Sequence, residues 1–220
     1  LRMLLAQLAV LALLAPSLAT ADSSIAIYRQ LFGDVNKQLA EARDANAEVL
    51  SPDNFSRAMK HYKDAETNFN QRRNLDGVRQ DIGKAQDWLS KAMEATGISA
   101  IAFAPAMQTR KNALSADAPT HAAQAWSQAE QALQDATRRV EDGDIRRAKE
   151  QARAVTELYQ QAELQAIKTN YLSGAGELLK QAKQEKADRY ATKTFIDAKL
   201  LLEQAERELT ENRYDTDYPR

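Results

Sequence analysis

The chain carries an apolar seam that recurs in three stretches with a common spacing. In each stretch the apolar residues follow one another in steps of three and four positions, which predicts an amphipathic helix. The outer copies contain Phe55, Ala58, Tyr62, Ala65 and Phe69, then Phe195, Ala198, Leu202, Ala205 and Leu209, and the middle copy contains Ala122, Trp126, Ala129 and Leu133. Three copies of one pattern predict an array of helical repeats.

An Ala-Glu dipeptide occurs in every copy and offers a way to align them. The dipeptides begin at Ala65, Ala129 and Ala205, so this alignment makes the second interval between copies longer than the first. It also makes Tyr62, Trp126 and Leu202 equivalent positions. We therefore expect these three side chains to fill the same place in successive cores.

Further seams predict helices around these copies. We expect a first helix over Ile25–Leu50 and a second that begins at Ser51-Pro52, because serine is a favoured N-cap and proline is tolerated in the first helical turn. Turns are expected at Asn74–Gly77 and at Glu141–Asp144, where breakers and small polar residues gather.

The two long helices between the turns differ in their interruptions. Gly97 and Pro105 predict a kink or a break in the first of them, and the repeat favours a kinked helix that continues to about Ser115. The other reaches from Ile145 to about Ala187. Its first half has seven consecutive seam positions, namely Ile145, Ala148, Ala152, Val155, Tyr159, Ala162 and Ala166.

Together these elements predict an all-α fold. Only 7 Gly and 5 Pro interrupt 220 residues that are rich in helix formers. We expect an elongated array of antiparallel helical hairpins that alternate short and long helices, with left-handed coiled-coil-like packing. The expected divisions are a signal peptide (1–21), an N-terminal helical bundle that forms the first repeat (22–114), and a second hairpin repeat with the start of a third (115–220).

The beginning of the chain, over 1–21, has the pattern of a cleaved signal peptide. Met3–Ala15 is apolar except for Gln7, and it is shorter than the roughly 20 residues that span a bilayer. Ala19 and Ala21 place small residues at the −3 and −1 positions, which predicts cleavage between Ala21 and Asp22. The alternative is an uncleaved anchor.

Charge and cysteine content narrow the possible functions. The net charge is −1, from 30 basic and 31 acidic side chains, which gives no overall positive field for nucleic acid. The chain has no cysteine, and this excludes disulfides and thiolate metal sites. His61 and His121 are the only histidines, and neither has the neighbours of a metal site, so we expect both to be exposed surface residues.

Motifs for catalysis or small-molecule binding are also missing. There is no nucleophile set and no glycine-rich phosphate loop, and we expect no enzyme activity, cofactor or small-molecule substrate. Five aromatic residues allow two interpretations, a ligand groove or core packing, and core packing is preferred because most of them lie on seams. They are Tyr62, Trp88, Trp126, Tyr159 and Phe195.

Arginine pairs flank the predicted turns. Arg72-Arg73 and Arg138-Arg139 follow or end a helix, where cations complement the helix dipole. Arg146-Arg147 begins the next one. Contact with an anionic lipid or cell-wall polymer is a candidate role for Arg138, Arg139, Arg146 and Arg147.

Several stretches resemble the helical N-terminal region of OmpA-family cell-envelope proteins. They are Ala118-Pro119, Glu141–Asp144, the segment YQQAELQAIKTNY at Tyr159–Tyr171, and Asn212–Arg220. The resemblance covers residues 115–220 best and residues 25–114 as a weaker repeat. Many members of that family carry a C-terminal peptidoglycan-binding domain, which we do not find within residues 1–220, so peptidoglycan binding is assigned to no residue here.

The resemblance implies export to the periplasm of a Gram-negative cell, with outer-membrane association. It implies a non-catalytic helical spacer or protein-interaction module, either as a piece of a longer OmpA-like protein or as a free helical module. Partners would be envelope proteins, or peptidoglycan through a separate domain. A tetratricopeptide-like adaptor that binds peptides is the alternative, although its repeat of roughly 34 residues is shorter than the spacing here.

Overall fold

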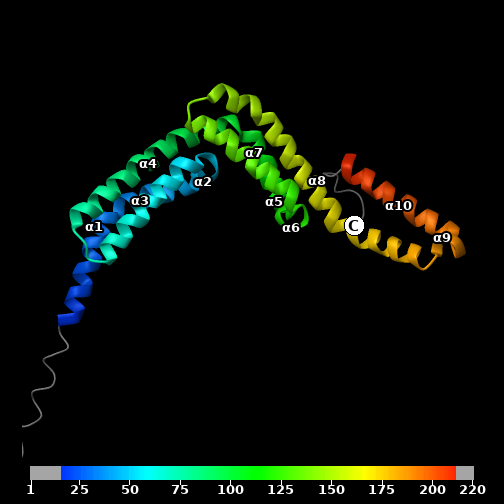
Figure 1. Ribbon diagram of the computed structural model, residues 1–220, viewed down its shortest axis with the longest axis horizontal. Coiled ribbons are helices and arrows are strands. Elements are labelled where there is room, and N and C mark those ends of the chain that lie inside the picture. The colour runs from blue at the N-terminus through cyan, green and yellow to red at the C-terminus, as the bar shows by residue number, and fades with distance from the viewer. Residues whose placement is uncertain (1–15, 212–220) are drawn as a thin grey trace, which may run out of the picture. The chain divides into compact units, whose positions relative to one another are not determined.

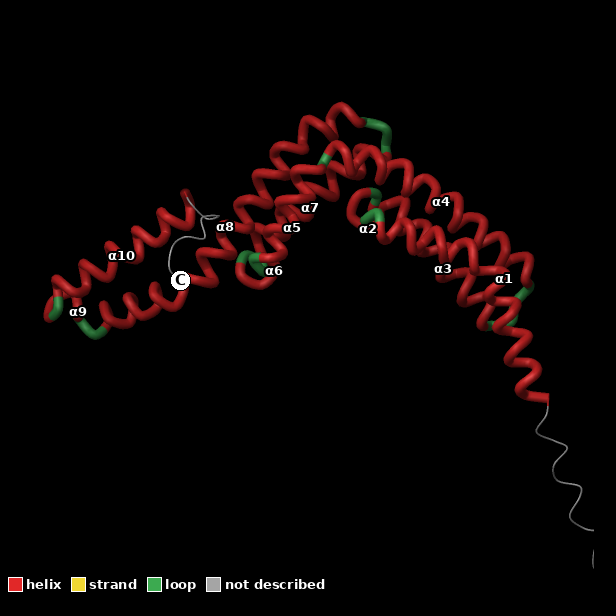
Figure 2. Tube along the Cα trace, turned by 180° about the vertical axis from the view of Figure 1, so that it is seen from behind, coloured by secondary structure: helices red, strands yellow, loops and turns green. Residues whose placement is uncertain are grey.

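A computed structural model describes residues 16–211, with side chains from residue 24 onward. Within that range the chain forms ten helices and no strand, so the all-α prediction is confirmed (Figure 1). The helices are α1 (Pro16–Asp44), α2 (Ala47–Leu50), α3 (Pro52–Asn70), α4 (Leu75–Ala102), α5 (Ala104–Ser115), α6 (Ala118–His121), α7 (Ala123–Glu141), α8 (Ile145–Gln184), α9 (Ala187–Tyr190) and α10 (Thr192–Glu211). Short loops join them (Figure 2).

The helices gather into two compact units, Leu1–Thr96 and Gly97–Arg220, whose boundary falls inside α4. In the first unit, α1, α2, α3 and most of α4 enclose one apolar core. The buried side chains of this core are Phe32, Val35, Leu39, Ala42, Ala47, Phe55, Ala58, Ala65, Val78, Ile82, Ala85, Leu89 and Ala92. Alanine on facing seams lets the helix backbones approach closely, while the Phe32 ring packs edge-on against the rings of Tyr62 and Phe69.

In the second unit, α8 is the common partner of its neighbours. Its first half packs against α5, α6 and α7, and its second half packs against α10 (Figure 1). Val155, Tyr159, Ala162 and Ala166 of α8 are buried, as the seven-position seam predicts. The predicted packing of neighbouring helices in opposite directions is therefore observed in this unit.

One sharp corner occurs three times and sets the true repeat. Asn46, Asp117 and Lys186 all have left-handed backbone angles, with φ of 60°, 53° and 65°. Each begins a helix of only four residues, which is followed at once by a helix of 19 or 20 residues. Asn and Asp tolerate this conformation better than most residues, so the first two corners suit their sequences.

The backbone hydrogen bonds at the three corners follow the same scheme. Asn46 N donates to Arg43 O, Asp117 N donates to Leu114 O, and Lys186 N donates to Lys183 O, at 2.9–3.0 Å. After each short helix, the N–H groups of Phe55, Trp126 and Phe195 donate to the residue four positions earlier. The corner is thus a recurring unit of local geometry within this chain, and it fixes which residues correspond.

This correspondence corrects the register of the middle copy by one heptad. Asp117 lies almost midway along the chain between Asn46 and Lys186, so the two intervals are nearly equal, whereas the dipeptide alignment predicts unequal ones. Trp126 is therefore equivalent to Phe55 and Phe195, and Leu133 is the counterpart of Tyr62 and Leu202. A seam with steps of three and four is unchanged by a shift of seven positions. The alignment by the Ala-Glu dipeptide therefore placed the middle copy one heptad out of register.

Three predicted boundaries also differ from the structure. The expected first helix over Ile25–Leu50 is divided at the Asn46 corner. The first turn precedes Leu75, because Arg72 takes the left-handed angle and Asn74 Oδ1 accepts a hydrogen bond from Asp76 N. The helix predicted to continue through Pro105 is interrupted at Phe103, since proline has no N–H with which to continue the ladder.

Candidate functional site

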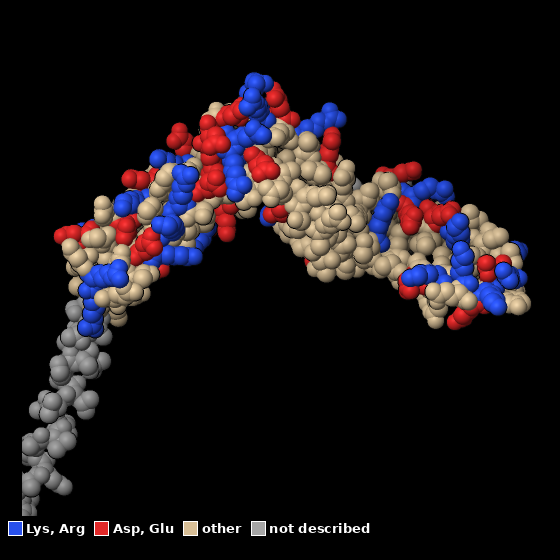
Figure 3. All heavy atoms as spheres, viewed as in Figure 1, with Lys and Arg blue, Asp and Glu red and all other residues tan. Residues whose placement is uncertain are grey.

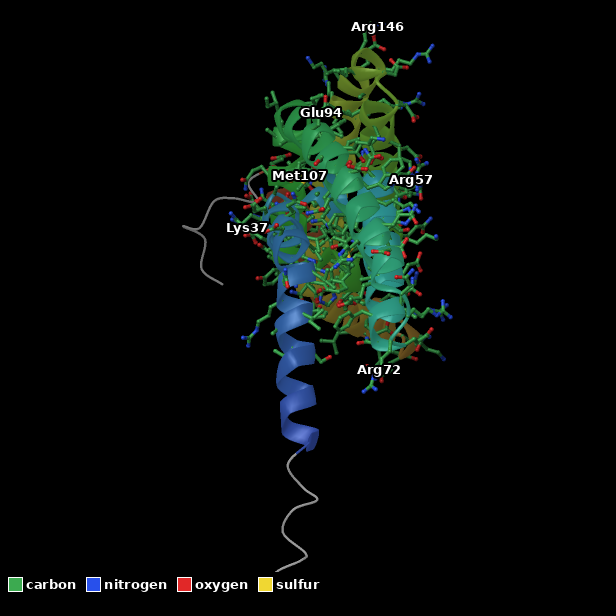
Figure 4. All side chains as sticks on the ribbon, turned by 90° about the vertical axis from the view of Figure 1, so that its left-hand side faces the viewer. Lys37, Arg57, Arg72, Glu94, Met107 and Arg146 are labelled. Atoms are coloured by element: carbon green, nitrogen blue, oxygen red, sulfur yellow. The ribbon has the colours of Figure 1, made fainter. Side chains whose placement is uncertain are left out.

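The four arginines named from the sequence lie on both sides of the α7–α8 turn. Arg138 and Arg139 are in the last turn of α7, and Arg146 and Arg147 are in the first turn of α8. Gly143, with φ of 82°, supplies the left-handed residue that reverses the chain between them. Figure 4 labels Arg146, whose neighbouring side chains at this end of α8 point away from the ribbon.

Each of these arginines interacts with a neighbouring side chain. Three pair with carboxylates: Arg138 with Asp135 at 3.8 Å, Arg146 with Glu150 at 2.6 Å, and Arg147 with Asp144 at 3.2 Å. Arg139 Nε donates to Gln151 Oε1 at 3.1 Å, which joins α7 to α8. Figure 3 shows basic and acidic side chains mixed at this turn. Anion contact by the four arginines stays a prediction.

The opposite end of α7 presents a different surface. Figure 3 shows an area without charged side chains over α5 and α6. The sequence explains it, because Asp117 is the one Asp, Glu, Lys or Arg residue between Lys111 and Glu130. The second unit is therefore charged at the α7–α8 turn and nearly neutral near the Asp117 corner.

A partly buried polar cluster joins three helices of the second unit. Arg110 of α5 binds Glu130 of α7 through two bonds, from Nε at 2.7 Å and from a terminal nitrogen at 3.1 Å. Tyr159 of α8 donates its hydroxyl hydrogen to Glu130 Oε1 at 2.6 Å. Trp126 covers the cluster, with its ring 5.6 Å from that of Tyr159 and 5.4 Å from the Arg110 guanidinium.

The surroundings of this cluster shift two pKa values. Burial of Tyr159, helped by its bond to Glu130 and by the carboxylate charge, raises the pKa of the phenol above its ordinary range. Burial alone lowers the pKa of Arg110, but the bond to Glu130 and its negative charge outweigh that effect, and the pKa is raised. Tyr159 is therefore a neutral donor and Arg110 a fixed cation.

The repeat shows what this cluster replaces. The positions of Arg110, Glu130 and Tyr159 correspond to Leu39, Met59 and Leu89 of the first unit. Leu39 and Leu89 are buried in its core and Met59 packs against it. The polar cluster thus occupies packing positions between helices and joins α5, α7 and α8.

The first unit has its own polar cluster, centred on Glu66. Its Oε1 atom lies 2.9 Å from the Tyr62 hydroxyl and 3.1 Å from the Tyr28 hydroxyl, both of which are donors. The Tyr62 hydroxyl also lies 2.8 Å from Asn36 Oδ1. Burial, followed by the bonds to Tyr28 and Glu66, raises the pKa of Tyr62 above its ordinary range. These contacts tie α1 to α3.

The two histidines are not the exposed residues that the sequence predicts. His61 is half-buried on α3, and its Nδ1 atom is buried without a hydrogen-bond partner. The His121 side chain is 31% exposed and lies 3.7 Å from Asp117. Both residues lie near the packed side of a helix, which the heptad pattern alone did not reveal. Among the described residues, no three His, Cys, Asp or Glu side chains form a group suited to a metal ion.

The five aromatic candidates differ in burial. Tyr159 is fully buried, which confirms core packing, while Tyr62, Trp88, Trp126 and Phe195 are half-buried. Trp88 of α4 lies under two cations, 4.7 Å from the Arg57 guanidinium and 4.2 Å from Lys91 Nζ. Figure 4 labels Arg57 on the side of the first unit.

The fold and these clusters define a class, an all-α protein of repeated and packed helices. Comparisons with known protein families, with curated proteins and with solved structures give no match. Among the described helices, none combines the length and apolar character needed to cross a membrane. The predicted signal peptide precedes the residues whose side chains are described, so cleavage after Ala21 stays a prediction.

Proposed function

We propose that the protein is a non-catalytic helical spacer and protein-interaction module of a Gram-negative cell envelope. It is exported through a signal peptide cleaved between Ala21 and Asp22, and it acts in the periplasm in association with the outer membrane. Its partners are other envelope proteins. The signal-like start and the OmpA-family resemblance of residues 115–220 support this location.

One observation carries the mechanical part of the proposal. The polar groups whose pKa values are raised, Tyr62, Arg110 and Tyr159, all bond to side chains of neighbouring helices. Side chains of this kind mark an active site when they converge in a cleft. Here they lock helices together, which supports a rigid module.

The helix lengths support an elongated arrangement. We infer an array in which helices of 19 or 20 residues alternate with longer ones, of which α8 has 40 residues and a length of about 60 Å. Seams with steps of three and four favour left-handed coiled-coil packing between them. The interval between corners is about twice the roughly 34 residues of a tetratricopeptide repeat, and this favours a spacer over that type of groove.

A distance measurement along α8 tests whether this helix serves as a rigid strut. The chain has no cysteine, so spin labels can be placed at Lys149→Cys and Lys180→Cys, both exposed on α8. A straight helix puts these sites about 46 Å apart, and we expect a narrow distribution there. A control pair at Lys149→Cys and Thr169→Cys should give about 30 Å.

The control pair isolates the weak point of the helix. Gly174 and Gly176 lie between Thr169 and Lys180, so only the longer pair spans them. A broad or shortened distribution for the longer pair, beside a narrow one for the control, would refute a rigid strut.

Export is tested separately. Mass spectrometry of periplasmic protein should find Asp22 at the N-terminus, and a chain retained in the cytoplasm would contradict the proposed location.

A further inference from the structure

Two cations from different helices lie over the ring of Trp88 in the first unit. The Arg57 guanidinium of α3 is 4.7 Å from the ring centre, and Lys91 Nζ of α4 is 4.2 Å from it. Both cationic side chains are exposed, and Figure 4 shows Arg57 at the side of the unit. Attraction to the indole face holds each cation in place. One ring therefore holds two positive charges close together at the surface.

These two charges have no acidic partner among the described residues. Arg57 and Lys91 contact the Trp88 ring and form no ion pair within that part of the chain. Other cations of the same unit are paired with a carboxylate, namely Lys37, Lys60, Arg79 and Lys84. Like charges that share one ring repel each other, and an anion from outside the chain would relieve this repulsion.

The helix opposite Trp88 supplies no carboxylate either. Asn68 of α3 donates to Asp81 of α4, which sets the register of these antiparallel helices. One heptad farther from the turn, His61 lies opposite Trp88. The His61 Nδ1 atom is buried without a hydrogen-bond partner. The group that faces Trp88 from α3 is therefore an imidazole and not an acid.

The second unit shows that the fold packs without this cluster. The left-handed corners align α3 with α7, and the bonds Asn68–Asp81 and Arg139–Gln151 align α4 with α8. In this alignment Trp88 corresponds to Leu158, and both are half-buried. The counterparts of Arg57, His61 and Lys91 are the uncharged residues Gln128, Ala132 and Gln161. The cations are thus a feature of the first unit that the shared architecture does not require.

The surrounding charges favour a small acidic group over an extended anionic surface. Residues 24–96 contain 11 basic and 11 acidic side chains, so the unit as a whole does not attract an anionic membrane. Asp87 and Glu94 are exposed on α4, beside Trp88 and Lys91 in the sequence. A charged surface would meet these carboxylates as well as the cations, whereas one or two acidic side chains can approach the cations alone.

We propose that Arg57 and Lys91, held by Trp88, bind two carboxylates of an acidic segment in a partner protein. A guanidinium stacked on a ring keeps its N–H edge free, and that edge binds a carboxylate through two bonds. Lys91 binds the second carboxylate as a point charge. Carboxylates on neighbouring turns of a helix, with Cβ atoms about 5–6 Å apart, suit two cations that share one ring. The inference rests on the proposed role as an interaction module and adds the chemistry of its partner.

A blocked helical peptide rich in alanine and glutamine, with two glutamates four positions apart, serves as the probe. Its matched control has glutamine in place of both glutamates. Each peptide carries an uncharged dye, and its fluorescence anisotropy is followed while the full chain is added at low salt. We expect the glutamate peptide to bind at least about tenfold more tightly than the control, and added salt to weaken its binding.

Two double variants with the same change in charge locate the site. Arg57→Gln with Lys91→Gln should lower the affinity for the glutamate peptide to that of the glutamine peptide. Arg79→Gln with Lys37→Gln also removes one arginine and one lysine from the first unit, and it should bind as the unmodified chain does. Circular dichroism of both variants checks that the helices persist.

Substitution of Trp88 tests whether the ring positions the two cations. Trp88→Leu keeps every charge and uses the residue type that the second unit has at Leu158, so the fold should persist. It should weaken binding of the glutamate peptide several-fold, because the cations lose their platform. Trp88→Phe keeps an aromatic face and should retain most of the affinity. Unchanged binding by Trp88→Leu would contradict the role of the ring.

Three further results would overturn the inference. They are equal binding of the two peptides, binding of the glutamate peptide that the Arg57 and Lys91 double variant leaves unchanged, or binding of anionic phospholipid vesicles, in place of the peptide, that this variant abolishes. The last result would assign the site to a lipid headgroup. None of them alters the label distances along α8, so a failure here can be told apart from a failure of the spacer role.

Discussion

Tyr159 donates a 2.6 Å hydrogen bond to Glu130, and through it α8 holds a carboxylate that α5 also holds by Arg110. The Arg110 side chain is 20% exposed and that of Glu130 is 33% exposed, so water screens the pair only in part. The first unit builds the same junction from Leu39, Met59 and Leu89. The chain thus contains a polar and an apolar version of one helix junction.

Replacing one member of the polar junction should cost more than replacing all three. We expect Glu130→Met to lower the free energy of unfolding by about 1–3 kcal/mol, because Arg110 and the Tyr159 hydroxyl lose their partner. The triple variant Arg110→Leu, Glu130→Met and Tyr159→Phe removes all the polar groups and should lie within about 1 kcal/mol of the original chain. Urea unfolding measures both, and a triple variant that is less stable than the single one would contradict this account.

Two of the 7 tyrosines should resist ionisation while the chain is folded. Burial and hydrogen bonds raise the folded-state pKa of Tyr62 and Tyr159 above the unfolded value of about 10. Their contribution to stability is therefore fully present below pH 10 and is lost as the pH rises above it.

Absorbance of tyrosinate at high pH checks this prediction. At pH 11, two tyrosines should remain protonated until urea unfolds the chain. The double variant Tyr62→Phe and Tyr159→Phe should lose that protected fraction and should show a weaker decline of stability above pH 10. Full ionisation of every tyrosine in the folded chain would contradict the burial of these hydroxyls.

The two turns that follow α3 and α7 offer a reciprocal test of backbone strain. Arg72 and Gly143 hold the same left-handed position, with φ of 53° and 82°. Arg72→Gly should raise the stability by about 1 kcal/mol and Gly143→Ala should lower it by a similar amount. A Cβ at Gly143 meets no atom within 4 Å, so the cost comes from the backbone angle and not from a clash. Melting temperatures that move in the same direction for both variants would refute this assignment.

The arginines at the α7–α8 turn give a prediction about anionic surfaces. Arg138, Arg139, Arg146 and Arg147 all have partners within the chain, so their replacement by Gln should leave sedimentation with envelope fractions unchanged. A control variant carries the same replacement by Gln at four exposed cations of the first unit, namely Lys37, Lys60, Arg79 and Lys84. Loss of sedimentation in the turn variant alone would assign an anionic contact to this turn.

The sequence predicts much of the fold because its information lies in the seams. The helical class, the turn at Glu141–Asp144 and the buried seam of α8 follow from apolar spacing. The register of Trp126 does not, since a heptad pattern is unchanged by a shift of seven positions. The register is fixed by local backbone geometry, namely the left-handed corners at Asn46, Asp117 and Lys186. No single residue type marks these corners.

The polar clusters are harder to foresee from sequence. Arg110 occupies a seam position where the first unit has Leu39, and this exchange becomes visible only after the copies are aligned by their corners. Burial in the last repeat is equally hard to foresee. Leu202 and Leu133 hold the same place in the pattern, yet Leu133 is buried and Leu202 is half-buried, because burial depends on a neighbouring helix and not on the seam itself.

Small-angle X-ray scattering of the chain tests the spacer proposal most directly. A compact sphere of 220 residues has a radius of gyration of about 17 Å. An elongated array built on a helix of about 60 Å should give a value well above this, with a pair-distance distribution that falls slowly toward long distances. A radius of gyration equal to that of the compact sphere, with a symmetric distribution, would contradict the account.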